Sequence, residues 1–186
     1  METLLFLSQE QLLAALQCGP CRERPWLLGV DGEQGTGKST LAKHFAQRLG
    51  ASVVSGDDFI RNGKVAYPQT LDLAALSERL TNAQENGESI IIESVMLQLI
   101  LQAINAEPAA IVYVRHNSFA GVYTQPYLFD ATLLAEAIER DNEIHRVFFP
   151  TDDSPSLAGE ILNYHLKYLP QLTSTHLLEH EFSYSS

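Results

Sequence analysis

Basic side chains are scarce in this sequence. Twelve lysines and arginines stand against 23 aspartates and glutamates, and the net charge is -11. Such a chain offers no broad cationic face, so we expect no nucleic-acid polymer as a partner. Small anions are not excluded, because local donors can hold them against an unfavourable net charge. Long apolar runs are also missing. None approaches the roughly 18 residues of a membrane span, which predicts a protein without a membrane partner.

The first residues lack the features of an export signal. Glu2 stands where a signal peptide would carry Lys or Arg. A lipoprotein signal that ends at Cys18 is not expected either, because Gln17 before the cysteine is not a small residue. We therefore expect a cytoplasmic protein.

The two cysteines form the motif CGPC, with Cys18 at its start and Cys21 at its end. Thioredoxins carry the same four letters, but there a strand precedes the motif and a helix follows it, so that the helix N-terminus lowers a thiol pKa. Here a helical pattern comes first and a strand-like run begins at Trp26. We interpret the motif as a Gly-Pro turn between two thiols, with redox or metal chemistry as the alternative.

The length of 186 residues and a hydrophobic content of 45% fit one globular domain without linkers. Hydrophobic spacing predicts helices over 9–17, 38–49, 71–84, 95–104, 130–146 and 157–169, and strands over 26–30, 51–55, 89–93, 109–115 and 175–182. Capping signals are Ser8 with Gln11, Gly50, Asp130 and Pro170. Alternating strands and helices predict an α/β fold, a three-layer sandwich with a mainly parallel sheet. We expect its core over 25–115 and a lid with C-terminal helices over 116–186.

A motif that binds phosphate follows the first long predicted strand. The stretch GEQGTGKS fits G-x-x-x-x-G-K-[ST] at every fixed position, which is typical of a P-loop NTPase that binds ATP. Glycines let successive N–H groups point at phosphate oxygens, and the following helix adds its positive end. The nucleotide-binding residues are then Gly32, Glu33, Gln34, Gly35, Thr36, Gly37, Lys38, Ser39 and Thr40. Lys38 would reach the β- and γ-phosphates, and Ser39 would offer its hydroxyl to Mg²⁺.

Two aspartates stand at the end of the next predicted strand, in the stretch SGDDF. Strand ends in such sheets face the cleft where a ligand sits. A carboxylate there could take the proton from an accepting hydroxyl, which makes Asp57 the candidate base. For its neighbour Asp58, the alternative to a catalytic role is a side chain that is only solvated.

These motifs together resemble the uridine kinase-like branch of P-loop kinases, which includes uridine, nicotinamide riboside and glycerate kinases. The resemblance implies a nucleoside-kinase-like fold with Asp57 as base. The doubled aspartate before Phe59 is closest to the glycerate-kinase form. Pro68 and Asp72 are similar to a family stretch in which a proline precedes an apolar-Asp pair and a helix.

The same resemblance assigns further residues. SIIIESVML is similar to the family strand that ends in an acid near the magnesium ion, so Glu93 joins Ser39 and Asp57 as a candidate metal ligand. IERDNEIHR resembles the lid segment whose arginines close over the phosphates, which nominates Arg140 and Arg146 as catalytic residues. Pairing of these arginines with helical glutamates is the alternative.

The sequence departs from uridine kinases where an acidic residue would hold the ribose hydroxyls, because Ala66 and Tyr67 precede Pro68. The expected activity is therefore an ATP-dependent phosphotransferase that acts on a hydroxyl of a nucleoside, a sugar or a small hydroxy acid. The alternative is a P-loop ATPase or nucleotide-binding regulatory protein without such an acceptor. Whether the chain forms a homodimer stays open.

Overall fold

The computed structural model describes residues 3–61, 69–117, 130–148 and 156–181. In these ranges six strands form one parallel sheet in the order β1-β6-β5-β2-β4-β3. The strands are β1 (Leu4–Phe6), β2 (Leu27–Gly32), β3 (Ser52–Ser55), β4 (Ile90–Glu93), β5 (Ala110–Asn117) and β6 (His176–Glu181). The predicted parallel sheet is confirmed, and β1 and β6 extend it beyond β5.

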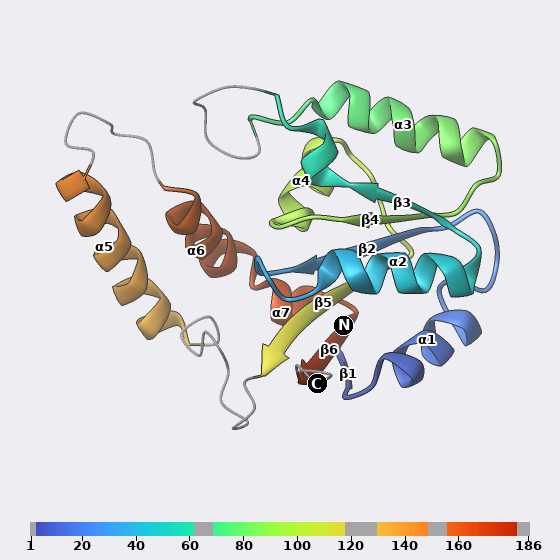
Figure 1. Cartoon of the computed structure of the whole chain (residues 1–186), viewed down its shortest axis with the longest axis horizontal. Helices are drawn as coiled ribbons and strands as arrows, with labels where there is room; N and C mark the ends of the chain where they lie inside the picture. The colour runs from blue at the N-terminus through green and yellow to red at the C-terminus, as the bar shows by residue number, and fades with distance from the viewer. Residues whose placement is uncertain (1–2, 62–68, 118–129, 149–155, 182–186) are drawn as a thin grey trace, which may run out of the picture.

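Helices cover both faces of the sheet (Figure 1). The described helices are α1 (Gln9–Cys18), α2 (Lys38–Leu49), α3 (Leu73–Glu85), α4 (Leu97–Ala103), α5 (Ala131–Phe148), α6 (Leu157–Tyr168), α7 (Pro170–Thr173) and the 3₁₀ helix η1 (Gly56–Phe59). Of these, α5 lies beyond the carboxyl ends of the strands and not over a face of the sheet. One buried cluster joins α1 and α2 to one face of the sheet, through residues such as Phe45 and Val30. A second cluster joins α3 and α4 to the other face, through Leu76 and Ile92. The three-layer arrangement follows from these two apolar faces.

Helix ends agree in part with the capping signals. Gly50 ends α2 in the left-handed conformation, and Asp130 accepts hydrogen bonds from the first N–H groups of α5. Ser8 is the N-cap of α1, but its side chain makes no capping hydrogen bond, so the expected capping box is wrong. Pro170 follows the end of α6 and begins α7, because proline suits the first position of a helix.

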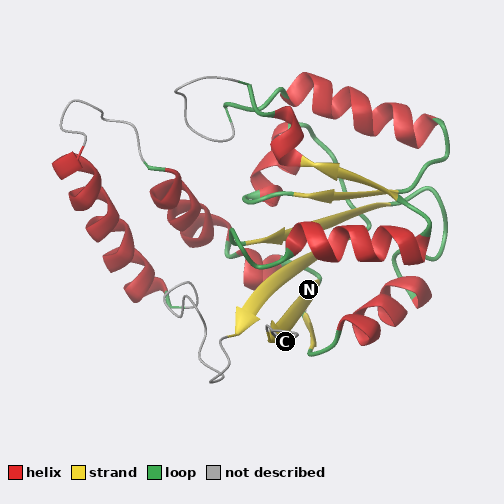
Figure 2. Ribbon diagram, viewed as in Figure 1, coloured by secondary structure: helices red, strands yellow, loops and turns green. Residues whose placement is uncertain are grey.

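Because the strands are parallel, their carboxyl ends lie together at one edge of the sheet. In Figure 2 the arrowheads of the central strands point toward the side on which α5 and α6 lie. Ligands of open α/β sheets bind outside this edge. Asp31 near the end of β2 and Glu93 at the end of β4 therefore lie where a site is expected. No helix in the described ranges is long and apolar enough to cross a membrane.

Candidate active site

The turn between β2 and α2 forms the cradle that the glycine-rich motif predicts. Gly32 has φ +147°, and a Cβ there would lie 2.5 Å from the carbonyl oxygen of Val114, so only glycine fits. The carbonyl oxygen of Glu33 accepts hydrogen bonds from the Thr36 hydroxyl, at 2.8 Å, and from the Thr36 N–H, at 3.4 Å. Helix α2 begins right after this turn, at Lys38. Its N-terminal N–H groups and positive dipole end favour an anion at the turn.

The Lys38 side chain is buried inside the cradle. Its Nζ donates a hydrogen bond to the carbonyl oxygen of Glu33 at 2.5 Å. Burial lowers the pKa of the Lys38 ammonium, and the charges of Asp31, Glu93, Asp57 and Glu33 oppose that shift. Four carboxyl groups thus act on one desolvated cation at the carboxyl edge of the sheet.

Glu93 and the start of η1 lie side by side. Ser55 is the register partner of Glu93, and its hydroxyl donates a hydrogen bond to Glu93 Oε1 at 2.6 Å. Gly56 packs so closely on the Ser94 side chain that a Cβ there would collide with it. This contact holds η1, which carries Asp57, against the end of β4, where the buried Glu93 stands.

The two aspartates of η1 differ in their relation to the cradle. Both Asp57 and Asp58 are exposed. The Asp57 charge acts on Lys38, whereas Asp58 is not among the described groups that shift the Lys38 pKa. Asp57 is therefore the better placed of the two to face a phosphate held by Lys38.

The candidate magnesium ligands fit a site that is completed by the nucleotide. No group of three or more His, Cys, Asp or Glu side chains in the described ranges could cage a metal by itself. Mg²⁺ beside phosphates needs only one or two protein carboxylates, since phosphate oxygens and waters complete its octahedron. The exposed Ser39 hydroxyl in the first turn of α2 and the carboxylates of Glu93 and Asp57 are chemically suitable for that role.

Asp31 is a buried carboxylate at the base of the cradle, and sequence reasoning missed it. Its Oδ1 accepts hydrogen bonds from the N–H of Gly32 at 2.8 Å and of Leu97 at 3.4 Å. The Tyr164 hydroxyl donates a hydrogen bond to Oδ2. Burial raises the pKa of Asp31 to about 6. The available signal was an aspartate inside the otherwise apolar run WLLGVDG, but its partner lies on a distant helix.

A second buried contact anchors α6 to the sheet. The Tyr113 hydroxyl and His165 Nε2 are 2.7 Å apart, and His165 Nδ1 lies 2.8 Å from the carbonyl oxygen of Ile161. A carbonyl can only accept, so we assign the proton to Nδ1 and the Tyr113 hydroxyl as donor to Nε2. Burial lowers the pKa of His165, which favours the neutral ring that this arrangement needs.

The described residues between η1 and α3 are held together by an ion pair and a backbone hydrogen bond. Arg61 forms an ion pair with Asp72 at 2.5 Å, and the Arg61 N–H donates to the carbonyl oxygen of Thr70 at 2.6 Å. The hydrogen bond from Arg61 lowers the pKa of Asp72, which also caps α3. Ala66, Tyr67 and Pro68, on which the comparison with uridine kinases depends, lie outside the described residues.

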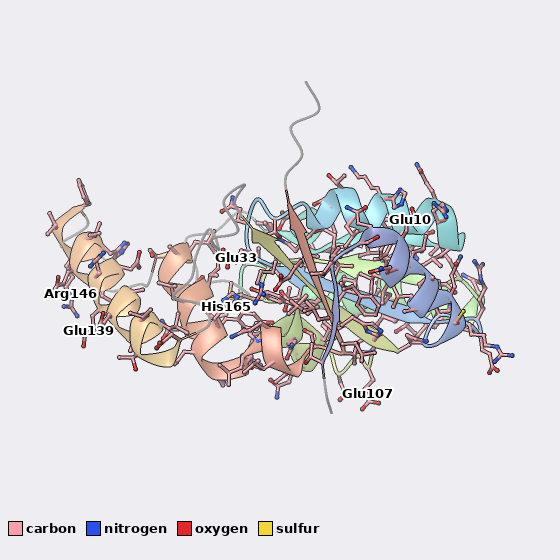
Figure 3. The ribbon with its side chains drawn as sticks, turned by 90° about the horizontal axis from the view of Figure 1, so that it is seen from below. Glu10, Glu33, Glu107, Glu139, Arg146 and His165 are labelled. Atoms are coloured by element: carbon pink, nitrogen blue, oxygen red, sulfur yellow. The ribbon has the colours of Figure 1, made fainter. Side chains whose placement is uncertain are left out.

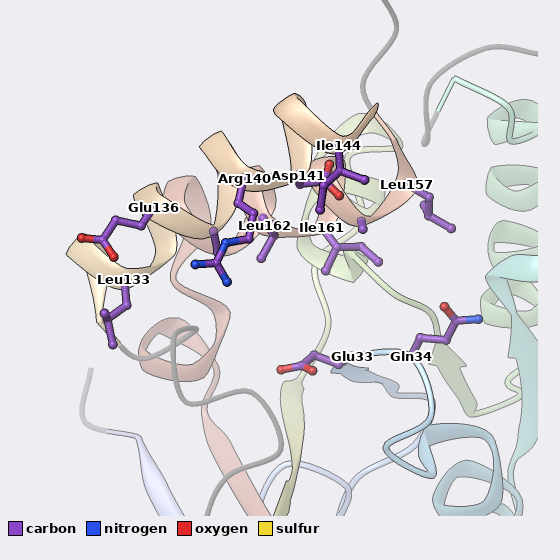
Figure 4. Close-up of a pocket in the computed structure, with 12 residues that line it drawn as sticks. Glu33, Gln34, Leu133, Glu136, Arg140, Asp141, Ile144, Leu157, Ile161 and Leu162 are labelled. Atoms are coloured by element: carbon purple, nitrogen blue, oxygen red, sulfur yellow. The ribbon is translucent and has the colours of Figure 1, made fainter. Parts of the chain in front are cut away.

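A cavity of about 700 Å³ lies between the cradle and the helices α5 and α6. Glu33 and Gln34 line it from the cradle, and Arg140 extends into it from α5 (Figure 4). Arg146 is exposed on α5 and is not among the described lining residues. Figure 3 shows it at the end of the molecule away from Glu33. The structure thus brings Arg140, but not Arg146, to the cradle side of α5.

The two cysteines of the CGPC motif lie at and just after the end of α1, before β2. Cys18 and Cys21 are free thiols, and burial raises the pKa of Cys21 to about 12. A thiol with so high a pKa is a poor nucleophile, in agreement with a plain turn. Arg115, near the end of β5, forms an ion pair with Glu179 of β6.

The architecture matches solved structures. The chain is similar to a "putative fructose transport system kinase" from Silicibacter sp. TM1040, with a TM-score of 0.51, 17% identity, and coverage of 92% of this chain and 99% of that chain. At this identity the likeness shows a common fold. It confirms the α/β fold with a parallel sheet between helical layers that the sequence predicts.

Two further solved structures give lower scores. A sugar kinase from Janibacter sp. HTCC2649 has a TM-score of 0.47 at 15% identity, over 84% of this chain and 85% of that chain. A "possible uridine kinase" from Bacillus stearothermophilus has a TM-score of 0.42 at 19% identity, over 71% of this chain and 94% of that chain. No protein-family model matches this sequence, and a comparison with curated proteins gives no significant match.

Proposed function

We propose that this protein is an ATP-dependent kinase that transfers the γ-phosphoryl group to a hydroxyl of a small molecule, such as a nucleoside, a sugar or a small hydroxy acid. One observation carries the proposal. The buried Lys38 of the cradle and the exposed Asp57 of η1 follow β2 and β3, so both lie at the carboxyl edge of one parallel sheet, and the Asp57 charge opposes the lowering of the Lys38 pKa. A phosphate-binding cation beside a candidate proton acceptor is what phosphoryl transfer to an alcohol needs.

The nucleotide would lie along the cradle from Gly32 to Thr40. Backbone N–H groups would hold the phosphates, and Lys38 would hold the terminal ones. Ser39, Glu93 and Asp57 are suited to hold Mg²⁺, which when bound neutralises charge on the β- and γ-phosphates. Arg140, from the far side of the cavity, would approach the transferred group, and Arg146 would act only after a rearrangement of α5.

Asp57 would accept the proton of the substrate hydroxyl. The freed oxygen then forms a bond to the γ-phosphorus while the bond between that phosphorus and the β–γ bridging oxygen breaks, so that ADP leaves. The Lys38 ammonium and the Arg140 guanidinium stabilise the negative charge that spreads over the equatorial oxygens. These roles demand a carboxylate rather than an amide at position 57.

A panel of nucleosides, sugars, glycerate and pantothenate-like alcohols tests the proposal. With full-length protein and Mg-ATP, we expect ADP release that depends on one class of acceptor. ATP hydrolysis that is independent of every acceptor would instead support the P-loop ATPase or nucleotide-binding regulator. Absence of affinity for Mg-ATP would contradict both functions.

A cytoplasmic location belongs to the same proposal, because ATP is available there and thiols such as Cys18 and Cys21 stay reduced. Sedimentation of the purified protein would show whether it forms a homodimer.

A further inference from the structure

Resting on the proposed function, we propose that the cavity between the cradle and helices α5 and α6 binds the phosphoryl acceptor, and that this acceptor is a non-anionic alcohol with an aliphatic body. The cavity encloses about 700 Å³. Small-molecule sites commonly measure about 300–1,000 Å³. This volume can hold an acceptor larger than glycerate.

The cavity adjoins the end of the cradle where the terminal phosphate would lie. Lys38 Nζ is 2.5 Å from the carbonyl oxygen of Glu33, and the lysine of such a motif reaches the β- and γ-phosphates. The side chain of Glu33 lines the cavity, together with Gln34. Arg140 points into the same space from the opposite wall (Figure 4). An acceptor in the cavity would therefore lie between the γ-phosphate and α5. Because Asp57 is not among the described lining residues, the reacting hydroxyl would have to extend from the cavity toward η1.

The charges around the cavity disfavour an anionic acceptor. Its described lining contains the carboxyl groups of Glu33, Glu136 and Asp141 and one cation, Arg140. Burial raises the pKa of Glu33 to about 7, so part of this group is neutral, yet Glu136 and Asp141 still outnumber the arginine. With a triphosphate bound, a carboxylate or phosphate on the acceptor would meet further repulsion.

Aliphatic side chains make up much of the opposite wall. Leu133, Ile144 and Leu157 line the cavity and keep 44%, 51% and 49% of their surface exposed. A ligand that covers these large apolar side chains removes them from water, and this burial favours binding. Continuity with Glu33 of the cradle favours a small molecule over a protein as the occupant. A wholly polar acceptor such as glycerol would leave these side chains wet.

Pairs of alcohols that differ mainly in one feature test the inference. Panthenol and pantothenate differ in charge, and 3-butoxypropane-1,2-diol and glycerol differ in the aliphatic part. With full-length protein that binds Mg-ATP, we expect turnover of an aliphatic neutral alcohol and a kcat/KM for the carboxylate lower by about tenfold or more, since like charges repel. Preference for pantothenate, equal use of glycerol, or no turnover of either aliphatic alcohol would overturn the inference. Failure to bind Mg-ATP would instead overturn the proposed function.

Charge reversal on α5 gives a matched comparison. Glu136→Lys should reduce the preference for panthenol over pantothenate by about fivefold or more, whereas Glu139→Lys should leave the ratio unchanged. Glu139 is exposed on the same helix but is not among the described lining residues. The ratio between two acceptors cancels general losses of activity. Equal effects of the two substitutions, or none, would overturn the inference.

A second comparison tests the aliphatic wall. Ile144→Ser should raise the KM for the aliphatic alcohol with little change in kcat, and Val147→Ser, which alters a 76% exposed residue of the same helix, should change neither. If Ile144→Ser leaves that KM unchanged, the inference is wrong. If it instead dissociates a dimer in sedimentation, the surface is an interface between two copies of this chain, and the inference is also wrong.

Discussion

The Tyr164 hydroxyl donates a hydrogen bond to the buried carboxylate of Asp31, and this contact joins α6 to the cradle. The other carboxylate oxygen accepts from the N–H of Gly32, the first peptide of the cradle. The N-terminal half of α6 lines the cavity, through Leu157 and Ile161. One helix therefore touches both the cavity and the base of the phosphate-binding turn.

Tyr164→Phe should weaken Mg-ATP binding and lower the free energy of unfolding by about 1–3 kcal/mol, because it leaves a buried carboxylate oxygen with one donor fewer. Tyr168→Phe is the matched control, since it removes the same hydroxyl from the same helix, where it donates a hydrogen bond to Gln102 at the surface. Calorimetric titration and urea unfolding measure the two effects. Equal behaviour of the two variants would show that the Asp31 contact has no special role.

Lys38→Ala should lower kcat/KM by an amount that corresponds to about 2.7–4 kcal/mol, as does the loss of one preorganised donor in a transition state. Lys43→Ala removes an exposed lysine from the same helix and should leave the rate unchanged. Steady-state kinetics with saturating acceptor make the comparison. Normal turnover of the Lys38 variant would remove the cradle from the mechanism.

Asp57→Asn should keep the affinity for Mg-ATP within a few-fold and lower kcat by roughly 100- to 10,000-fold, the range expected for loss of a general base. Asp58→Asn alters the adjacent exposed carboxylate and should retain most of the activity. Nucleotide affinity by titration and rate by ADP release separate binding from chemistry. If Asp58→Asn alone abolished the rate, the base would be the other aspartate.

Asp31 should make stability depend on pH. Burial raises its pKa from 3.8 to about 6, so between these values the folded state binds more protons than the unfolded state. The stability that this group contributes is full below pH 3.8 and is lost as the pH rises through about 6. The unfolding free energy of the wild type minus that of Asp31→Asn should thus fall by roughly 3 kcal/mol across this window, at about 1.36 kcal/mol per pKa unit. A constant difference between pH 4 and pH 7 would contradict the burial of this charge.

Short sequence patterns predicted most of the helices and strands that form the three layers. The cradle is recognisable because its glycines and Lys38 lie at fixed spacing between an apolar run and a helical pattern, and no long-range information is needed. Asp130 also reveals the start of α5 through a side chain that bonds the next N–H groups. Strand β1 was not predicted, because three residues are too few to show an alternating hydrophobic pattern. Its residues Leu4 and Leu5 are also more than half exposed.

The base of the site needed the folded chain. Tyr164 lies 133 residues from Asp31, and the helical pattern of α6 gives no indication of which face meets β2. The cavity likewise depends on where α5 stands, which spacing cannot specify. Local patterns fix which residues are helical, whereas the partners of a buried polar group follow from packing.

The pairing of β1 with β6 places the outermost strand late in the order of assembly. Leu4 is aligned with His176, so this parallel ladder closes a separation of more than 170 residues along the chain. At roughly 5–20 residues per second of translation, β1 waits on the order of ten to thirty seconds for its partner to emerge. In a growing chain the sheet can be built from β2, β3, β4 and β5 first, and β1 is paired only after β6 has been made.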